Sequence, residues 1–360
     1  MSHVLPWLLV AAELVALSVV GPRLFRSARG GRRLVEVGDQ SAQSARISVV
    51  IPARNESSRI AECLAPLRGA PGVHEVIVVD DQSSDDTAMI AGSFGAAVVH
   101  GVPLPDGWVG KIWALQQGIS AASGDVIVTL DADARPHPSL PVSAADALHE
   151  SGAVLGTVSP RFRTGSEAGT WLHASMLTSL VYRHGAGSGR AGKDAVANGQ
   201  CMVFRRDSAV RGDWCASVSG EIIEDVALVR RLVREGEQVE MFDGSSLLTV
   251  HMFEGFGDTW RGWGRSLSLA SVDRPLRLWS DAFITLIAAV SPLWLLATGA
   301  ATPLTGLLLL VRLGTLVGTA RTYERRGPGY WLSPLADLLA WIVVVRGILA
   351  PSREWRGRQY

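Results

Sequence analysis

The sequence predicts an α/β fold with a mostly parallel sheet flanked by helices, and with apolar segments at both ends of the chain. Three short, β-branched apolar runs at residues 47–51, 76–79 and 126–130 indicate buried strands. The segments between these runs have the apolar spacing of helices, which is typical of βαβ units and therefore of parallel strands. Long uncharged stretches near both termini predict the apolar segments.

Polar residues follow each of the three predicted strands. These residues are Pro52, Arg54 and Glu56 after the first strand, Asp81 after the second, and Asp131 and Asp133 after the third. Ligands of open α/β sheets bind at the carboxyl ends of the strands, so we expect these groups to meet in one crevice. Carboxylates gathered there suit a divalent cation, and the Asp-x-Asp turn predicts a site that holds a diphosphate through that cation.

Charge balance and cysteine usage exclude several classes of protein. With 34 basic and 34 acidic side chains, the chain has no basic excess and is not expected to bind nucleic acid. Cys63, Cys201 and Cys215 are too few and too widely spaced for a disulfide framework or a zinc site. We expect them to be buried thiols in a reducing compartment.

The apolar N-terminus is predicted to be a membrane anchor. Residues 4–20 are apolar apart from Glu13, and arginines follow this run. A secretory signal peptide carries its positive charges before the apolar core, whereas charges after the core place the carboxyl side in the cytoplasm. The predicted order is a transmembrane anchor at 1–22, a basic linker at 23–45 and a catalytic α/β domain at 46–255.

The C-terminal part predicts further membrane elements. We expect an interfacial amphipathic helix at 256–278, a transmembrane hairpin at 279–320, and a third apolar segment with a basic tail at 321–360. Asp337 and Arg346 interrupt the third segment, so it is either a crossing or a re-entrant segment, and the side of the tail stays open. The chain is thus predicted to be a multi-pass protein of the cell membrane with a cytoplasmic catalytic domain.

The same periodicities predict the remaining elements of the central domain. Helices are expected from residue 57 to about 67 and at 84–94, 111–122, 143–149, 170–182 and 224–234. Further strands are expected at 96–99, 153–158 and 196–204. Glycine and proline mark a loop at 101–110, and a glycine-rich segment at 184–194 is predicted to be mobile.

The ordered set of polar strand ends resembles the family 2 glycosyltransferases from residue 47 to about residue 265. The resemblance implies the GT-A fold and a nucleotide-sugar donor. It implies that Asp81 reads the uracil edge of a UDP-sugar, while Pro52, Arg54 and Glu56 surround the nucleoside. It also implies that Lys111, at the start of a helix, reaches the base or the phosphates.

The resemblance also implies the metal and the catalytic carboxylates. Asp131 and Asp133 would hold Mn²⁺ or Mg²⁺, which stabilises the charge of the departing nucleoside diphosphate. A single displacement with inversion needs one further carboxylate to accept the acceptor's proton. Asp225 matches the family's base position, and Glu224 lies beside it. The alternative for both is a pair of carboxylates that the helix dipole favours at a helix N-terminus.

Three features concern the expected acceptor side. Gln200 lies in a segment that resembles the sugar-lining part of these enzymes, where it either bonds a sugar hydroxyl or ends a strand. Processive members carry Gln-x-x-Arg-Trp, whereas this chain has Trp-Arg-Gly-Trp at 260–263, which favours a single addition over polymer synthesis. Arg261, Trp263 and His251 are the expected acceptor or interface residues.

Three further stretches resemble the 4,4'-diaponeurosporenoate glycosyltransferases of carotenoid synthesis, namely 107–111, 254–256 and the tail at 354–360. The resemblance implies transfer of a single hexose, with glucose expected, to a carotenoid-type acid or alcohol in the membrane. An ionised acid acceptor needs no base and would be repelled by an ionised Asp225, so a retained Asp225 favours a hydroxyl acceptor. A hopanoid, sterol, ceramide or polyprenyl phosphate is the alternative acceptor.

Two other classes of protein compete with glycosyl transfer. A nucleotide-dependent oxidoreductase on a Rossmann sheet is disfavoured because the first strand is followed by Pro-Ala-Arg-Asn-Glu and not by a glycine fingerprint. A transporter or scaffold would not require acidic groups at successive strand ends, and the apolar segments are few for a transport path. The sequence identifies neither the sugar nor the lipid.

Overall fold

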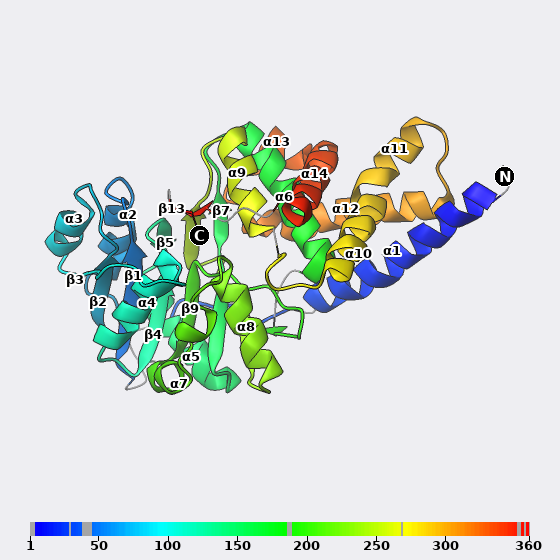
Figure 1. Ribbon diagram of the computed structural model, residues 1–360. Helices are drawn as coiled ribbons and strands as arrows, with labels where there is room; N and C mark the ends of the chain where they lie inside the picture. Colours follow the sequence, from blue (N-terminus) through cyan, green and yellow to red (C-terminus); the bar gives the residue numbers. More distant parts are fainter. Residues whose placement is uncertain are drawn as a thin grey trace. The chain divides into compact units, whose positions relative to one another are not determined.

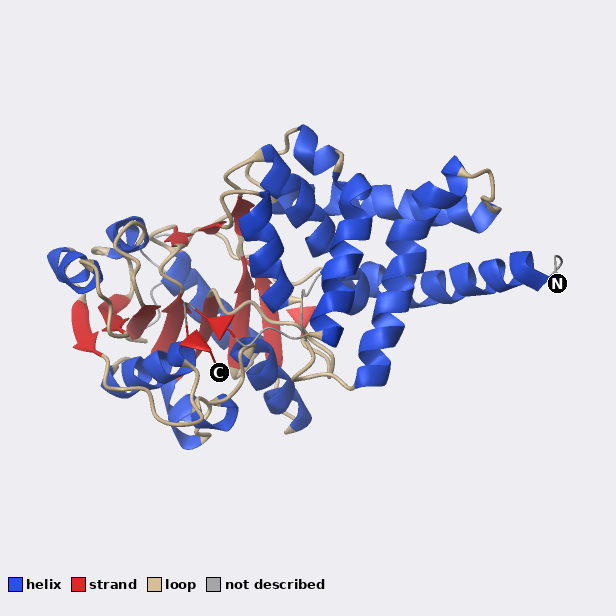
Figure 2. Cartoon of the chain, turned by 45° about the horizontal axis from the view of Figure 1, so that its top comes forward, coloured by secondary structure: helices blue, strands red, loops and turns tan. Residues whose placement is uncertain are grey.

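The computed structural model describes residues 4–28, 30–37, 45–185, 189–267, 269–350, 354–355 and 358–359. The chain divides into two compact units. The sheet unit comprises Gly31–Phe162, Ser188–His251 and Glu354–Tyr360, and the helical unit comprises Met1–Gly30, Arg163–Gly187 and Met252–Arg353. Figure 1 labels their elements, and Figure 2 shows that the long strands belong to the one unit while the other is built from helices. The predicted linker segment 38–44, part of the glycine-rich stretch and most of the basic tail lie outside the described residues.

An eight-stranded sheet with the order β3-β2-β1-β4-β9-β6-β10-β8 forms the centre of the sheet unit. Its strands are β1 (Ile47–Ala53), β2 (Val73–Asp80), β3 (Ala97–His100), β4 (Val126–Leu130), β6 (Leu155–Ser159), β8 (Gly189–Arg190), β9 (Cys201–Arg205) and β10 (Val239–Asp243). The predicted core strands are parallel neighbours, and β9 runs antiparallel between β4 and β6. The mostly parallel sheet predicted from the sequence is therefore confirmed.

The strands are continuous apolar runs because both faces of the sheet are covered. Every residue of β4 is buried, and β1 is buried except at Pro52. Helices α4 (Gly110–Ala121) and α5 (Leu140–Ser151) pack against these central strands. In this register Ala53 of β1 lies beside Asp80 of β2, so the polar residues after both strands reach the same edge of the sheet.

Shorter elements complete the sheet unit. The helices are α2 (Ile60–Leu64), η2 (Ala65–Leu67), α3 (Thr87–Ser93), α7 (Arg206–Arg211), η3 (Ala216–Val218) and α8 (Glu224–Arg234). A small sheet has the order β5-β11-β7, from β5 (Ala134–Pro136), β11 (Leu248–His251) and β7 (Arg161–Arg163). At the end of the chain, β12 (Glu354–Trp355) pairs with β13 (Arg358–Gln359).

The strand predicted at 196–204 is shorter than expected, and its first half is not a strand. Asn198 uses its side-chain amide to bond Val158 O at 2.7 Å, and the Gly199 N–H goes to a side chain, so neither residue joins a ladder. The pairing with β4 and β6 begins only at Cys201. Strands β10 and β11 were not predicted; β10 carries Glu240 and Asp243, and β11 is a run of only four residues.

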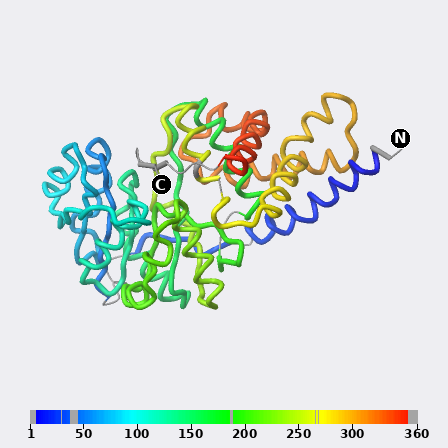
Figure 3. Tube along the Cα trace, in the orientation of Figure 1, coloured from blue at the N-terminus to red at the C-terminus, as the bar shows by residue number. Residues whose placement is uncertain are grey.

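The helical unit combines segments that are far apart in the sequence. Its elements are α1 (Val4–Ala28), α6 (Glu167–His184), α9 (Phe256–Ser266), α10 (Pro275–Thr285), η4 (Leu286–Val290), α11 (Ser291–Ala297), α12 (Pro303–Thr319), η5 (Ala320–Thr322), α13 (Pro328–Trp331), η6 (Ser333–Ala336) and α14 (Asp337–Leu349). Figure 3 follows α1 alongside α10 and α12, which contact it. Helix α6 falls within the catalytic domain expected at 46–255, but its contacts are with this unit.

Three helices among the described residues are long and apolar enough to cross a membrane, at Pro6–Ala28, Pro275–Ala297 and Pro303–Thr322. They correspond to the predicted anchor and hairpin, although the first helix continues beyond the expected boundary at residue 22. Many large apolar side chains on these helices are exposed, among them Trp294 and Leu310, as expected for lipid-facing surfaces. Membrane association is therefore the arrangement that these helices suggest.

Buried polar contacts join the helices of this unit. Glu13 of α1 is fully buried and accepts hydrogen bonds from the hydroxyls of Thr302 and Thr305, which cap α12. In α12, Arg312 donates from Nε and Nη2 to the carboxylate of Asp337, at 2.7 and 2.9 Å. Unpaired charges are costly in an apolar environment, so these partners fix how α1, α12 and α14 pack.

The predicted interfacial helix and the third apolar segment form shorter helices than their predicted ranges. Helix α9 ends at Ser266 and α10 begins at Pro275, so the interfacial helix does not extend over 256–278. Helix α14 has 13 residues, a length of about 20 Å against a hydrocarbon core of about 30 Å. Helix α14 by itself is therefore shorter than a full crossing requires, and Asp337 in its first turn is buried.

Candidate active site

The loops after β1 and β2 are joined into one framework. Asp81 donates its backbone N–H to Ala53 O at 2.8 Å, and Arg54 Nη1 donates to Asp81 O at 2.6 Å. Asn55 and Gln82 adopt left-handed backbone conformations, with φ of 53° and 56°, which turn the chain sharply at both strand ends. The structure therefore brings together Arg54 and Asp81, two of the residues predicted to contact the nucleoside.

Lys111 joins the ends of three other elements. Its Nζ lies 2.9 Å from Asp131 Oδ1 at the end of β4 and 3.2 Å from Glu224 Oε1 at the start of α8. It also donates to Gly199 O, at 3.3 Å, just before β9. The start of α4 is held against the segment before α8, because Val109 donates its N–H to Ser219 O at 2.7 Å. Three residues predicted on separate grounds thus share one ion-pair network.

Both carboxylate oxygens of Asp225 accept backbone hydrogen bonds. Gly199 donates its N–H to Oδ2 at 2.7 Å, and Val226 donates to Oδ1 at 2.8 Å. The second bond is local to the start of α8, whereas the first reaches another segment of the chain. The carboxylate is consequently held in one orientation, with lone pairs left for a further donor.

Burial and neighbouring charges perturb this cluster. Burial by itself would lower the pKa of Lys111, but Asp131 and Glu224 outweigh burial and raise that pKa. Burial raises the pKa of Glu224 to about 7, although Lys111 acts in the opposite direction. Burial also raises the pKa of Asp225, against Lys111 and the backbone amides that bond it. Perturbed carboxylates gathered at strand ends are typical of catalytic sites.

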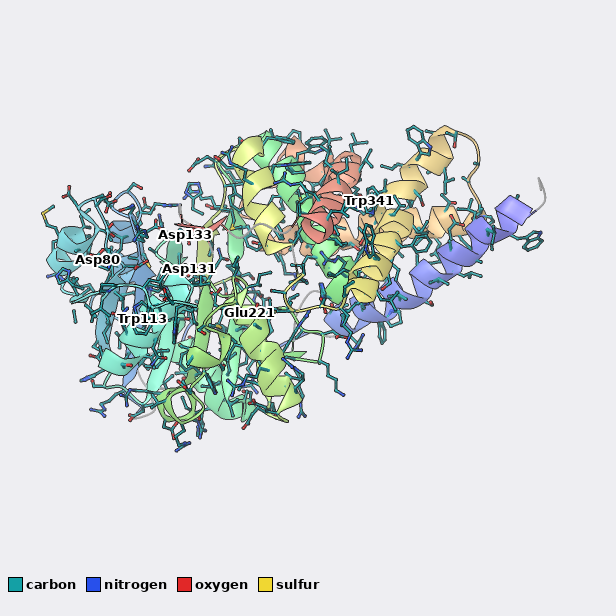
Figure 4. All side chains as sticks on the ribbon, viewed as in Figure 1. Asp80, Trp113, Asp131, Asp133, Glu221 and Trp341 are labelled. Carbon is teal, nitrogen blue, oxygen red and sulfur yellow. The ribbon has the colours of Figure 1, made fainter. Side chains whose placement is uncertain are left out.

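Asp131 and Asp133 lie together at the carboxyl end of β4, as Figure 4 shows, and provide the hard oxygen donors that Mn²⁺ and Mg²⁺ prefer. Within the described residues no cluster of three or more His, Cys, Asp or Glu side chains is ready to hold a metal. Two carboxylates fit a cation that takes its remaining ligands from a diphosphate and water. His251 lies nearby, since its N–H points to Asp133 O at 3.5 Å.

The other predicted donor-side residues occupy the same edge of the sheet. Gln200 accepts the backbone N–H of Asp131 on its carbonyl, at 3.0 Å, which places it beside the Asp-x-Asp turn. Glu56 is buried and forms an ion pair with Arg59 at 3.0 Å. Pro52 lies within β1 one residue before the loop. The site thus draws on β1, β2 and β4, as the strand-end pattern predicted.

Two of the residues predicted for the acceptor or interface, Arg261 and Trp263, belong to helix α9 of the helical unit. Trp263 is buried in the helical unit, where its ring meets His173 edge-on at 5.2 Å, so it does not present an exposed acceptor surface. Arg261 is exposed and pairs with Asp258 of its own helix at 2.6 Å. Packing of α9 against α6 buries Trp263, whereas Phe256 of the same helix stacks on Trp171 of α6 and is 39% exposed.

Gly199 is the site residue that the sequence did not single out. It contacts both Lys111 and Asp225. Its position in an Asn-Gly-Gln stretch is the signal that could have indicated a close backbone approach.

A pocket of about 530 Å³ lies at the opposite edge of the sheet, lined by residues that include Arg46, Asp125 and Arg205. It is distinct from the carboxylate cluster. The three cysteines are buried and free, as predicted.

Comparison with known proteins gives the family. Residues 48–211 match the Glycosyl transferase family 2. The 4,4'-diaponeurosporenoate glycosyltransferase of Staphylococcus haemolyticus (strain JCSC1435) is 28% identical over 257 residues, which is 66% of this chain and 67% of that protein. The protein of the same name from Staphylococcus aureus (strain USA300) is 24% identical over 336 residues, 87% of this chain and 88% of that one.

A solved structure shares the fold. The mannosyltransferase from Pyrobaculum calidifontis, in complex with GDP-Man and Mn²⁺, covers 97% of this chain and 99% of its own, with a TM-score of 0.58 and 16% identity. These matches remove the oxidoreductase and transporter alternatives. The chain is a glycosyltransferase that carries a Glycosyl transferase family 2 domain at residues 48–211, shares the GT-A type of fold, and is similar to the 4,4'-diaponeurosporenoate glycosyltransferases.

Proposed function

We propose that the enzyme transfers one hexose, with inversion, from a UDP-sugar to a lipid acceptor in the membrane. The observation that carries the proposal is the network in which Lys111 joins Asp131 to Glu224, while Asp225 is fixed beside it through Gly199. In this proposal a donor-side carboxylate and a candidate base belong to one site. Glucose is the hexose that the resemblance to the carotenoid enzymes favours.

The donor would bind along the carboxyl edge of the sheet. Asp81 and Arg54, already joined to each other, would contact the uridine, with Pro52 and Glu56 around the nucleoside. Asp131 and Asp133 would hold Mn²⁺ or Mg²⁺, and the cation would neutralise charge on the leaving diphosphate. Gln200 lies beside Asp131, where it could bond a sugar hydroxyl. The mannosyltransferase of the same fold was solved with Mn²⁺, which supports a divalent cation.

Asp225 is the proposed base. Two backbone N–H groups orient its carboxylate, and its raised pKa suits a group that takes a proton from a hydroxyl acceptor. Glu224 is paired with Lys111 and is better placed to hold that lysine than to receive a proton. One base and no second nucleophile correspond to a single displacement, and therefore to inversion at the anomeric carbon.

The membrane arrangement follows from helix lengths and the order of the chain. Helix α1 ends just before the sheet unit begins, α10 to α11 would cross away from that side, and α12 would return. Arg321, Arg325 and Arg326 follow α12, and positive charges favour the cytoplasmic side for that end. We infer three crossings, a cytoplasmic sheet unit, and a short α14 that stays on the cytoplasmic side, where the β12–β13 pair also belongs.

A lipid acceptor explains why a sugar-nucleotide enzyme would be tethered, because a hydrophobic acceptor does not diffuse through water. The name of the similar staphylococcal enzymes refers to a carotenoid acid. We propose a carotenoid-type acid or alcohol as the acceptor of this enzyme. If Asp225 is the base, the alcohol is favoured as acceptor over the acid, because an ionised acid has no proton to give up. Hopanoid, sterol, ceramide and polyprenyl-phosphate lipids are the alternative acceptors.

The function is tested by incubating membranes that contain the enzyme with radiolabelled UDP-glucose, a lipid extract and Mn²⁺. A single labelled glycolipid should form, mass spectrometry should show one added hexose, and EDTA should abolish the product. Parallel reactions with GDP-mannose test the donor. Label that appears in a polymer or in free sugar, or transfer from GDP-mannose alone, would contradict the proposed reaction.

A further inference from the structure

Lys111 forms an ion pair with the first carboxylate of the Asp-x-Asp turn, Asp131. Its ammonium is 2.9 Å from Asp131 Oδ1, and its side chain is only 14% exposed. Asp131 is therefore already paired with a positive charge when no donor is bound. A divalent cation that binds Asp131 must compete with this ammonium for the same carboxylate.

The ammonium also fits its surroundings closely. It has three hydrogens, and three acceptors from three elements lie around it: Asp131 Oδ1, Glu224 Oε1 and Gly199 O. The chain uses arginine almost everywhere, since Lys111 and Lys193 are its only lysines among 34 basic residues. A lysine at this position is thus an exception in composition as well as in contacts.

We propose that Lys111 is a resident counter-ion that makes cation binding depend on the donor diphosphate. The inference rests on the proposed function, because it assumes that Asp131 binds the metal. With Lys111 in place, one of the two carboxylates of the Asp-x-Asp turn is already neutralised, and the turn alone attracts a divalent cation weakly. The negative charge of a diphosphate restores the attraction, so cation and nucleotide bind together.

The other contacts of Lys111 explain how it can release Asp131 to the cation. When Asp131 turns to the cation, Lys111 keeps Glu224 and Gly199 O as partners and does not become an unpaired buried charge. Its remaining contacts lie on the segment that orients Asp225. Lys111 is therefore a positioning residue between the donor side and the proposed base, and cation entry would be coupled to loading of the donor.

The test measures Mn²⁺ binding to the purified full-length protein in detergent, from the electron paramagnetic resonance signal of free Mn²⁺. In the wild type, UDP should tighten Mn²⁺ binding by about tenfold or more, which corresponds to about 1.4 kcal/mol. Lys111→Met should tighten the binding of Mn²⁺ alone by a similar factor and should reduce the effect of UDP. Lys111→Arg, which keeps the charge, should bind Mn²⁺ alone as weakly as the wild type.

Lys193→Met is the matched control, because Lys193 is the other lysine of the chain and is exposed, and it should behave as the wild type. The proposal is overturned if Lys111→Met binds Mn²⁺ alone no more tightly than the wild type, or if Lys111→Arg matches Lys111→Met. Should Lys111→Met fail to fold, wild-type Mn²⁺ affinity that is equal with and without UDP would overturn it as well.

Asp131→Asn separates this inference from the proposed function. If Asp131→Asn abolishes Mn²⁺ binding in the presence of UDP while Lys111→Met changes nothing, the metal site stands and only the counter-ion role fails. If Asp131→Asn binds Mn²⁺ and UDP as the wild type does, the metal site itself is wrong.

Discussion

Gly199 donates its backbone N–H to Oδ2 of Asp225 at 2.7 Å, and a methyl group added at Gly199 would lie 3.0 Å from that same oxygen. The added carbon would also lie 3.1 Å from the Cβ and Cγ atoms of Asp225. These contacts are tighter than ordinary van der Waals separations. The proposed base is therefore positioned by a residue that has no side chain, and any side chain there would press on the carboxylate.

Gly199→Ala should consequently lower kcat by about tenfold or more while the KM for the donor changes little, since small displacements of a reacting group are costly. Initial rates of glycolipid formation at varied UDP-glucose measure both constants. Gly192→Ala is the control, because no atom lies near its added methyl group. Equal kcat values for Gly199→Ala and the wild type would contradict the close contact.

Asp225→Asn should abolish transfer, by about 100-fold or more, and should leave UDP binding intact. The amide cannot accept a proton from the acceptor, and one of the two backbone donors loses its partner oxygen. Transfer assays and UDP titrations measure the two properties. Asp207→Asn, at an exposed position on α7, should behave as the wild type. Unchanged turnover in Asp225→Asn would remove Asp225 from its role.

Asp133→Ala should weaken Mn²⁺-dependent nucleotide binding, because it removes one of the two carboxylates proposed for the cation. UDP affinity measured across a Mn²⁺ titration should lose most of its dependence on the metal. Asp207→Ala serves as the exposed control. If the Asp133→Ala variant titrates with Mn²⁺ as the wild type does, the metal assignment is wrong.

The stability of the enzyme should fall as the pH rises through the range set by Glu224. Burial raises the pKa of Glu224 from 4.5 to about 7, so the folded state holds a proton that the unfolded chain has lost. This contribution is fully present below pH 4.5 and is lost as the pH rises through about 7. Thermal midpoints from pH 4.5 to 8 should therefore decline less in Glu224→Gln than in the wild type. Glu235→Gln, at the far end of α8, should keep the wild-type slope, and parallel slopes in all three proteins would count against the assignment.

The buried ion pair of the helical unit predicts a pattern across three variants. Arg312→Met leaves Asp337 as an unpaired buried charge and should destabilise the protein by about 3–5 kcal/mol. Arg312→Met with Asp337→Leu removes both charges and should recover most of the loss. Thermal unfolding in detergent, followed by size-exclusion chromatography, measures each variant, with the exposed Arg321→Met as control. A double variant less stable than Arg312→Met would contradict this account.

The edge of the sheet that carries the site was predictable from the sequence. Residues after β1, β2 and β4 were expected to meet because parallel strands end at one edge, and Arg54 bonds Asp81 there. The same local reasoning predicted three apolar helices, since the length of an apolar run is a property of the sequence alone. A period of two or 3.6 residues involves only neighbours in the chain, so the strands and helices that it predicts depend little on distant contacts.

Side-chain partners in the site required the tertiary structure. Lys111 pairs with Asp131 and Glu224, which come from distant segments, and no spacing in the sequence relates them. In the helical unit, the sequence predicted Trp263 as an acceptor or interface residue, whereas the packing of α9 against α6 buries its ring.

The sequence by itself determined the class of fold, the edge of the sheet where the chemistry gathers, and the apolar helices. The tertiary structure decided which charges neutralise one another and which aromatic rings are covered. The physical reason is that an apolar run or a strand end depends on neighbouring residues in the chain, whereas an ion pair or a buried ring depends on segments that only folding brings together.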